Sequence, residues 1–428
     1  MGKKIVLIGA GSAVFTQGLV ADLIQMPDLG VSELGLVDTS PEALDVVQRL
    51  VQRMITTKKA DICLSASTDR RDILPGSDVV VTTIAVGGRR AWETDVFIPR
   101  QFGIYQPVGD SVMPGGISRA LRMIPAMLSI ARDIHALCPD ARFFNYSNPM
   151  SAICRAVRKA TNVKVIGLCH GTFHTGSYLA QLAGTPRSEA TFLAVGLNHL
   201  TWIFDFRWKG GNALPMAYEH RGEGNPFSWS LYEAYGAFPA PGDRHTTEFF
   251  PERFPSGHYY GKILGVDAFS FEKTIEHGDR TYAEMRGQAL GERPLKESIF
   301  QRAPGEHEQL MDMLMSIEKD ERRVFHVNMP NQGAVSNLPN DAILELPAVA
   351  TGRGFCQMHI DNFPYTIAAL LNRKIAAQEL TVEAALTGSR ELLIEALLAD
   401  GAVQDHNTAR RLCDALLNAH KQYLPQFN

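Results

Sequence analysis

The turn after the first apolar run constrains the fold of this chain more than any other feature. Residues 5–8 are apolar and rich in β-branched side chains, Gly9-Ala10-Gly11 follows at once, and helical spacing then runs from Ser12 to Met26. A strand that leads through Gly-x-Gly into a helix is typical of a dinucleotide-binding unit. Gly9 permits the tight turn, and Gly11 lets the backbone approach a pyrophosphate at the helix N-terminus. Val14 replaces the third glycine, so the motif is partial.

Asp38 supports the same interpretation, because it ends the second predicted strand, residues 34–37. A carboxylate there accepts hydrogen bonds from the adenosine ribose and repels a 2′-phosphate, which favours NAD over NADP. The alternative is a helix cap before Pro41. Taken with the glycines, the pattern predicts these cofactor-binding residues: Gly9, Gly11, Ser12, Ala13, Phe15, Asp38 and Thr83.

Strands and helices continue to alternate through the first half of the chain. We expect strands at residues 78–84, 142–145 and 163–168, and helices at 118–137 and 150–160. This alternation predicts an α/β fold with a Rossmann-type doubly wound parallel sheet. Near residue 190 the pattern changes, and a second α/β (α+β) domain is expected. We predict an NAD-binding domain at residues 1–195 and a substrate-binding and oligomerisation domain at 196–428.

Composition excludes several kinds of partner. A formal net charge of -4 with no block of like charge argues against nucleic acid. No run approaches the ~20 apolar residues that a membrane span needs. The N-terminal apolar run is too short for a signal peptide, so we expect a cytoplasmic protein with its six scattered cysteines reduced.

Three polar clusters follow predicted strands. They are Asn145–Pro149, Cys169-His170-Gly171 and Asn198-His199. A thiolate and an imidazole that meet at strand ends suit a borderline divalent metal. The alternative is a buried cysteine and a hydrogen-bonded histidine, because two ligands fall short of a typical closed site.

The order of motifs resembles a known family, the NAD- and divalent-metal-dependent glycosidases of glycoside hydrolase family four. The resemblance runs from about Ile5 to about Pro347. It rests on Gly9-x-Gly11-Ser12-x-x-Phe15, Gly115–Arg122, Ser147-Asn148-Pro149, Cys169-His170-Gly171, Asn198-His199, Gly242-Asp243, Gly305-Glu306 and Val327–Asn331.

The resemblance implies NAD and Mn²⁺, or another divalent metal, as cofactors, and a small-molecule glycoside as substrate. In that family NAD⁺ accepts a hydride from carbon three of the sugar, a base removes the hydrogen on carbon two, and the glycosidic oxygen leaves by elimination. Water then adds and the hydride returns, so the net reaction is hydrolysis, outside the usual two-carboxylate mechanism. A homodimer or homotetramer is expected.

Individual roles follow from the same resemblance. Cys169 and His199 match the metal-ligand positions, and Asn148 would contact sugar hydroxyls near the metal. His170 is a candidate acid for the leaving group or, alternatively, supports a ligand. Asp243 is a candidate base, with Tyr232 or Tyr235 as alternatives.

The substrate class rests on fewer residues. His170 after the metal cysteine resembles members that act on unphosphorylated sugars, and Gly171 resembles members that act on α-linked uronic acids. We expect an α-glucuronide or α-galacturonide, with Arg119 and Arg90 as substrate-binding residues and Arg89 and Arg244 as further cations. The run Gln106–Asp110 departs from the Gln-Glu-Thr type run of many members.

Three alternatives stay open. One is a neutral-sugar α-glucosidase or α-galactosidase of the same family. Another is an NAD-dependent 2-hydroxy-acid dehydrogenase, which would need a His–Asp pair and an arginine clamp but no metal-binding cysteine. The third is a non-catalytic NAD-binding sensor, which would need neither metal nor base.

Overall fold

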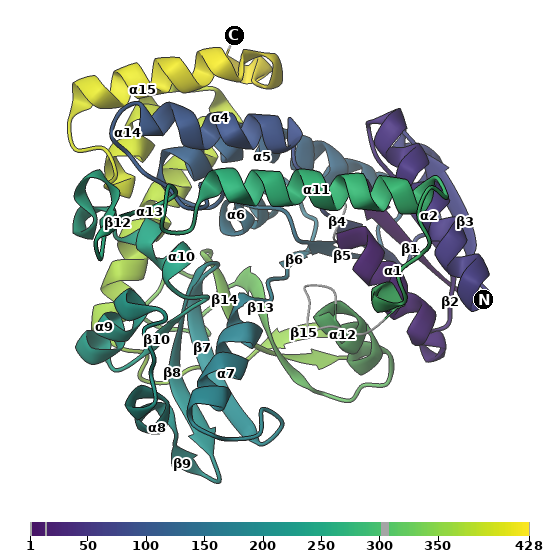
Figure 1. Cartoon of the computed structure of the whole chain (residues 1–428), viewed down its shortest axis with the longest axis horizontal. Helices are drawn as coiled ribbons and strands as arrows, with labels where there is room; N and C mark the ends of the chain where they lie inside the picture. The colour runs from purple at the N-terminus through teal and green to yellow at the C-terminus, as the bar shows by residue number, and fades with distance from the viewer. Residues whose placement is uncertain (1, 13–14, 301–307, 428) are drawn as a thin grey trace.

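The computed structural model describes residues 2–12, 15–300 and 308–427 (Figure 1). Within these ranges one mixed sheet of 13 strands runs through the molecule, with helices on its faces. Ala13 and Val14 of the first motif, and Gly305 and Glu306 of a later one, lie outside the described residues.

The first half of the sheet has the Rossmann strand order. Parallel neighbours follow the order β3-β2-β1-β4-β5-β6, which confirms the predicted doubly wound sheet. The order reverses between β1 and β4, so a crevice is expected beyond their carboxyl ends. The strands are β1 (Lys3–Ile8), β2 (Val31–Val37), β3 (Cys63–Ser67), β4 (Val79–Thr82), β5 (Arg142–Asn145) and β6 (Val165–Gly167).

Helices connect these strands, and local sequence signals set their ends. The Ser40 side chain accepts a hydrogen bond from the Ala43 N–H, Pro41 occupies the first turn, and Lys59 ends the helix in a left-handed conformation. The helices of this half are α1 (Phe15–Gln25), α2 (Pro41–Lys58), α3 (Arg70–Ile73), α4 (Gly88–Arg100), α5 (Met113–Leu137), α6 (Met150–Ala160) and α7 (Gly171–Leu182).

The second half extends the same sheet with antiparallel strands. β13 pairs with β6 through Asn328 and Gly167, so the sheet and the main apolar core pass from one half into the other. The strands are β7 (Ala190–Leu197), β8 (Leu200–Trp208), β9 (Gly211–Asn212), β10 (Phe238–Ala240), β13 (Val324–Pro330), β14 (Ile343–Thr351) and β15 (Gly354–Gln357). β11 (His258–Tyr259) and β12 (Lys262–Ile263) form a separate hairpin.

Short elements fill the Gly- and Pro-rich stretch after residue 210. They are α8 (Leu214–Glu219), α9 (Pro226–Tyr235), α10 (Asp243–Thr246) and three 3-10 turns, Thr247–Phe249, Pro251–Arg253 and Pro255–Gly257. The long α11 (Phe271–Ala289) then crosses the molecule and packs against α2 (Figure 1). α12 (Glu308–Glu318) follows the segment outside the described residues.

The C-terminal helices return to the first half of the chain. α13 (Tyr365–Thr387) packs on α5 and α6, α14 (Arg390–Asp400) packs on α13, and α15 (His406–Ala419) packs on α4 and α14. The sequence pattern predicts helices at 365–377 and 382–398, and that division is wrong. The break falls at Gly388, which is left-handed, and Ser389, which caps α14. None of the described helices is long and apolar enough to cross a bilayer.

Candidate active site

A cleft of about 1090 Å³ opens beyond the carboxyl ends of β1, β2 and β4. Five predicted cofactor-binding residues line it: Gly9, Gly11, Ser12, Asp38 and Thr83. Phe15 is instead buried against Tyr146, with ring centroids 4.4 Å apart. The cleft continues along Val86, Gly87, Arg89 and Trp92 at the start of α4.

Both glycines of the turn are required by close contacts. Gly9 has φ 89°, and a methyl group on it would lie 2.8 Å from the carbonyl carbon of Thr83. A methyl group on Gly11 would lie 2.8 Å from Oδ2 of Asp38. The Gly11 N–H donates to that oxygen at 2.9 Å, and the Ser40 N–H donates to Oδ1 at 2.9 Å. Asp38 therefore shapes the turn, and its remaining lone pairs can still accept ribose hydroxyls.

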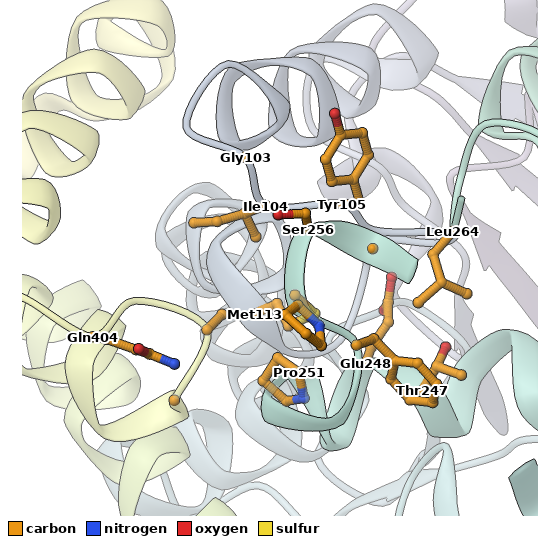
Figure 2. Close-up of a pocket in the computed structure, with 15 residues that line it drawn as sticks. Gly103, Ile104, Tyr105, Met113, Thr247, Glu248, Pro251, Ser256, Leu264 and Gln404 are labelled. Atoms are coloured by element: carbon orange, nitrogen blue, oxygen red, sulfur yellow. The ribbon is translucent and has the colours of Figure 1, made fainter. Parts of the chain in front are cut away.

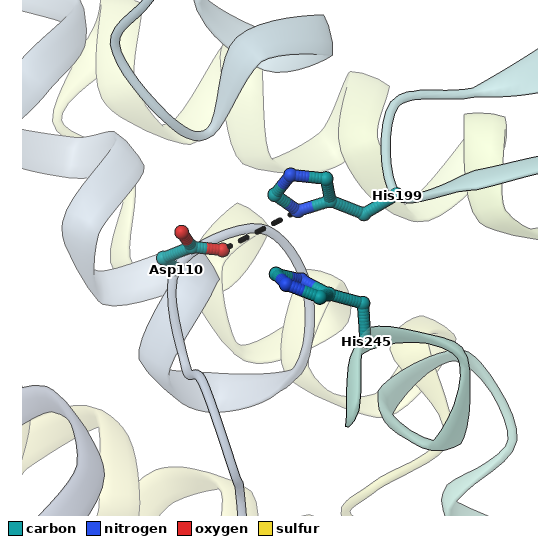
Figure 3. A group of neighbouring side chains, drawn as sticks. All are labelled: Asp110, His199 and His245. Carbon is teal, nitrogen blue, oxygen red and sulfur yellow. Dashed lines mark ion pairs between the residues drawn. The ribbon is translucent and has the colours of Figure 1, made fainter. Parts of the chain in front are cut away.

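A second group of side chains gathers where three distant segments meet (Figure 3). Asp110 lies in the loop before α5, His199 in the turn between β7 and β8, and His245 in α10. Ligand atoms of all three lie within 4.8 Å of one another. Oδ1 of Asp110 is 3.6 Å from Nδ1 of His199, and the two imidazole centroids are 4.2 Å apart. We call these three residues the Asp–His cluster.

Cys169 borders the Asp–His cluster. It is a free cysteine two residues after the end of β6, its thiol interacts with His199, and its Sγ accepts the Gly171 N–H at 3.4 Å. The structure therefore brings Cys169 and His199 together. It adds Asp110 and His245, which the sequence pattern did not identify as ligands.

The donor set fits a divalent metal. Thiolate, imidazole and carboxylate together suit a borderline ion. Asn148 lies beside the cluster, because its Nδ2 donates to Oδ2 of Asp110 at 2.9 Å. Its Oδ1 is buried and has no hydrogen-bond partner among the described residues, so this side chain keeps an unused acceptor.

The two imidazoles of the Asp–His cluster have opposite pKa shifts. Burial alone would lower the pKa of His199, but contacts with Asp110 and Cys169 raise it well above its usual range, so this imidazole must release a proton when it binds a metal. Burial, followed by the charge of His199, holds the pKa of His245 well below its usual range, so this imidazole is neutral, the form that binds metals. Burial alone would raise the pKa of Asp110, but the hydrogen bond and charge of His199, together with the charge of Arg119, bring it below the ordinary value.

Glu248 supports the loop that carries Asp110. It is buried, and its Oε1 accepts the N–H groups of Val108 and Gly109, each at 2.8 Å. Burial raises its pKa to about 8, despite these two bonds. Figure 2 shows its side chain at the wall of a second cavity, of about 190 Å³, which Met113 also lines. No sequence motif marked this residue.

Asp243 is engaged by four donors. Its carboxylate accepts the N–H groups of Phe227 and Ser228, the Ser228 hydroxyl and the Tyr259 hydroxyl, at 2.6–2.9 Å. The side chain is fully buried at the start of α9. This geometry favours a structural role, and the base assignment stays a prediction. The alternatives Tyr232 and Tyr235 pack on Trp229 and Trp202, with ring centroids 5.6 Å and 5.4 Å apart.

The candidate substrate residues divide into two groups. Arg119 lies beside the Asp–His cluster. Its Nε donates to the Asn148 carbonyl at 3.0 Å, and its guanidinium interacts electrostatically with Asp110. Arg90 is exposed and bound by Glu93 and Asp279, and Asp279 also pairs with Arg89 at 2.6 Å. Arg90 therefore has acidic partners of its own, and a substrate role for it stays a prediction.

His170 and Arg244 lie next to cluster residues in the chain. His170 is the N-cap residue of α7, with its ring 4.8 Å from that of His174. Arg244 precedes His245 and donates to Oγ1 of Thr274 at 3.2 Å. Among the described residues Arg244 makes no ion pair, so its charge is available to a ligand.

Comparison with known proteins identifies the family. Residues 4–185 match family 4 glycosyl hydrolase, and residues 194–403 match its C-terminal domain. The chain belongs to glycosyl hydrolase family 4. The match extends past the Pro347 limit of the sequence resemblance, and it excludes the 2-hydroxy-acid dehydrogenase and the non-catalytic sensor.

The relatives span several substrates. An α-glucosidase from Erwinia rhapontici is 30% identical over 99% of both chains. An α-galacturonidase from Bacillus subtilis is 31% identical over 98% of both. A 6-phospho-α-glucosidase from gut microorganisms, solved in complex with NAD and Mn²⁺, covers all of both chains with a TM-score of 0.88 at 19% identity. That structure supports the fold of this family 4 glycosidase.

Proposed function

We propose that this family 4 glycosidase hydrolyses an α-linked, unphosphorylated uronide, with α-galacturonide or α-glucuronide favoured, and uses NAD and a divalent metal such as Mn²⁺. The observation that carries the proposal is the contact made by Trp92. This residue lines the dinucleotide cleft, and its Nε1 donates to the Val108 carbonyl at 2.7 Å, two residues before Asp110. A sugar held at the Asp–His cluster would therefore lie beside the cleft.

The bound groups would supply a hydride acceptor and a Lewis acid. Gly9, Gly11 and Asp38 would hold the dinucleotide, as the turn geometry supports. The metal would be held by Cys169 and His199, with Asp110 and His245 completing the donor set. A related 6-phospho-α-glucosidase binds both NAD and Mn²⁺, which supports this assignment.

The remaining residues would orient the sugar and move protons. Asn148, with its free buried oxygen, would accept a sugar hydroxyl. His170, beside the metal-binding cysteine, would donate a proton to the leaving oxygen. Asp243 is the base predicted from the sequence, although its four donors argue against this role.

Arg244 supports the choice of a uronide. A sugar carboxylate needs a cation, and a guanidinium binds a carboxylate with two parallel hydrogen bonds. Arg244 is half-buried beside His245 and carries no acidic partner among the described side chains, unlike Arg89 and Arg90. The α-galacturonidase relative from Bacillus subtilis agrees with this reading.

The organisation of the chain is part of the proposal. Residues 1–195 would bind NAD, and residues 196–428 would bind substrate and form a homodimer or homotetramer. The described cysteines are free thiols, which suits a reducing cytoplasm and a metal bound by thiolate.

A glycoside panel tests the substrate. α-Galacturonide, α-glucuronide, α-glucoside and α-galactoside are assayed with NAD⁺, Mn²⁺ and a thiol reductant. The uronides should give the highest kcat/KM. Arg244→Gln should lower uronide kcat/KM at least ~10-fold, because a charged hydrogen bond is lost, and should leave neutral glycosides nearly unchanged. Arg207→Gln, at an exposed arginine with no predicted role, is the matched control.

Faster turnover of a neutral α-glucoside would support the second candidate. The similarity to the Erwinia rhapontici α-glucosidase favours that candidate. In that case Arg244→Gln should have no selective effect on the uronides.

A further inference from the structure

The end of the chain returns to the dinucleotide cleft. After α15, a 3-10 turn (Lys421–Tyr423) brings Tyr423 to the cleft wall, where it lies beside Gly87. A methyl group on Gly87 would lie 3.0 Å from Cε2 of the Tyr423 ring. Residues after 403 lie beyond both family matches, so nothing in those matches assigns this segment to the cofactor site.

A buried set of polar contacts fixes this segment. His420 is buried, and its Nε2 lies 2.9 Å from Oδ1 of Asp95. Asp95 forms a fully buried ion pair with Arg122. The Nε of Arg122 donates at 3.0 Å to the carbonyl of Val86, the residue before Gly87. The buried charges of Asp95 and Arg122 satisfy each other, and the His420 ring packs against this pair, so the chain end lies against the cleft wall.

A separate contact holds the residues that follow. Nε2 of Gln426 donates to the Leu121 carbonyl in α5 at 2.8 Å. In Figure 1, α15 and the C-terminus lie over α4 and α5. Tyr423 is thus anchored on both sides. Among the described residues, no side chain forms a hydrogen bond with its hydroxyl.

The position of Tyr423 in the cleft indicates which half of the dinucleotide its ring would contact. Asp38 follows β2 and faces the adenosine side. Gly87 follows β4, on the other side of β1, and shares this part of the cleft with Trp92, which leads to the Asp–His cluster. This is the side where the nicotinamide must lie to reach the sugar.

We infer that Tyr423 is a cofactor-binding residue whose ring forms the wall of the nicotinamide half of the cleft, and that His420, Asp95 and Arg122 position it. The inference rests on the proposed use of NAD. An aromatic ring offers a flat apolar surface to the pyridine and its ribose.

Calorimetric titration with NAD⁺ and with ADP tests the inference on the full-length protein. Tyr423→Ala should raise the Kd for NAD⁺ roughly fivefold or more and leave the Kd for ADP unchanged, because ADP fills only the adenosine side. Tyr423→Phe keeps the ring and should bind NAD⁺ within about twofold of wild type. Gln422→Ala, an exposed neighbour, is the control.

Each other outcome has a defined meaning. Unchanged NAD⁺ binding in Tyr423→Ala overturns the inference. An equal loss for NAD⁺ and ADP, or a Phe variant as weak as the Ala variant, also contradicts it. Failure of the wild-type protein to bind NAD⁺ would instead refute the proposed function itself.

Discussion

Two buried carboxylates near the active site have opposite surroundings. Asp243 receives four hydrogen bonds, whereas Glu248 receives two backbone N–H groups and has its pKa raised to about 8 by burial. Asp243 is therefore suited to hold α9 in place. Glu248, in its protonated form, is suited to hold the loop that precedes Asp110.

Asp243→Asn tests whether this residue is structural. An amide replaces one acceptor with a donor that faces other donors, so we expect a loss of about 1–3 kcal/mol in the free energy of unfolding. Urea denaturation measures it, and Asp361→Asn, on the exposed surface, should be neutral. Unchanged unfolding would contradict the structural role. Loss of exchange of the carbon-two hydrogen in a folded variant would support Asp243 as the base.

Glu248→Gln should change how stability depends on pH. The native pKa of about 8 lies above the ~4.3 of an unfolded glutamate, so the native state keeps a proton that the unfolded state loses. Wild-type stability should therefore fall as pH rises through this window, by at most ~1.4 kcal/mol per pH unit from this group.

The Gln variant lacks this contribution. Its stability relative to wild type should rise between about pH 5 and pH 8, as measured by urea unfolding of the metal-free protein. Exposed Glu252→Gln serves as the control. Parallel pH profiles for wild type and Glu248→Gln would show that the carboxyl is not protonated in the native state.

His245→Ala tests the membership of the metal site. Removing one neutral imidazole from the donor set should weaken Mn²⁺ binding at least ~10-fold, as measured by equilibrium dialysis under reducing conditions. His220→Ala, on the exposed surface, should bind Mn²⁺ like wild type. Equal affinity in the His245 variant would remove it from the site.

At the scale of elements, the sequence predicts buried strands and amphipathic helices best. β5 and α6 have the predicted bounds because an apolar pattern and clear end signals coincide. β3 is a half-buried edge strand with small polar residues, so its pattern is weak. α11 was missed because much of its length is polar and exposed, and only part of one face is buried.

The same limit applies to the site. Cys169 and His199 follow strands, so topology and the family resemblance could place them. Asp110, His245 and Glu248 lie in loops or a single helical turn, and no local pattern shows that they meet. Arg119 reaches the site from α5. Arg90 instead pairs with surface carboxylates, a contact that the sequence alone does not show.

Gly11→Ala tests whether the turn between β1 and α1 binds the dinucleotide. The added methyl would lie 2.8 Å from Oδ2 of Asp38 and 2.9 Å from Cβ of Ala43, so β1 and α1 must shift apart from α2. We expect the Kd for NAD⁺ to rise roughly tenfold or more, measured by titration. Gly222→Ala has open space and should bind normally. Normal binding in Gly11→Ala would place the dinucleotide elsewhere.

At the scale of the whole molecule, a single sheet supports both the dinucleotide cleft and the candidate metal site. β6 carries Cys169 at its end and pairs with β13, so the metal-site residues are fixed to the sheet that forms the dinucleotide cleft. The sequence resemblance predicted the combination of a Rossmann half and a second half. It did not predict that both share one sheet and that the last helices return to the first half.

Turnover of an α-galacturonide in D₂O with catalytic NAD⁺ and Mn²⁺, followed by NMR of the released sugar, tests the proposed mechanism most directly. We expect deuterium at carbon two of the product and no stoichiometric build-up of NADH. A product that retains its carbon-two hydrogen throughout turnover, or hydrolysis that proceeds without NAD⁺, would contradict it.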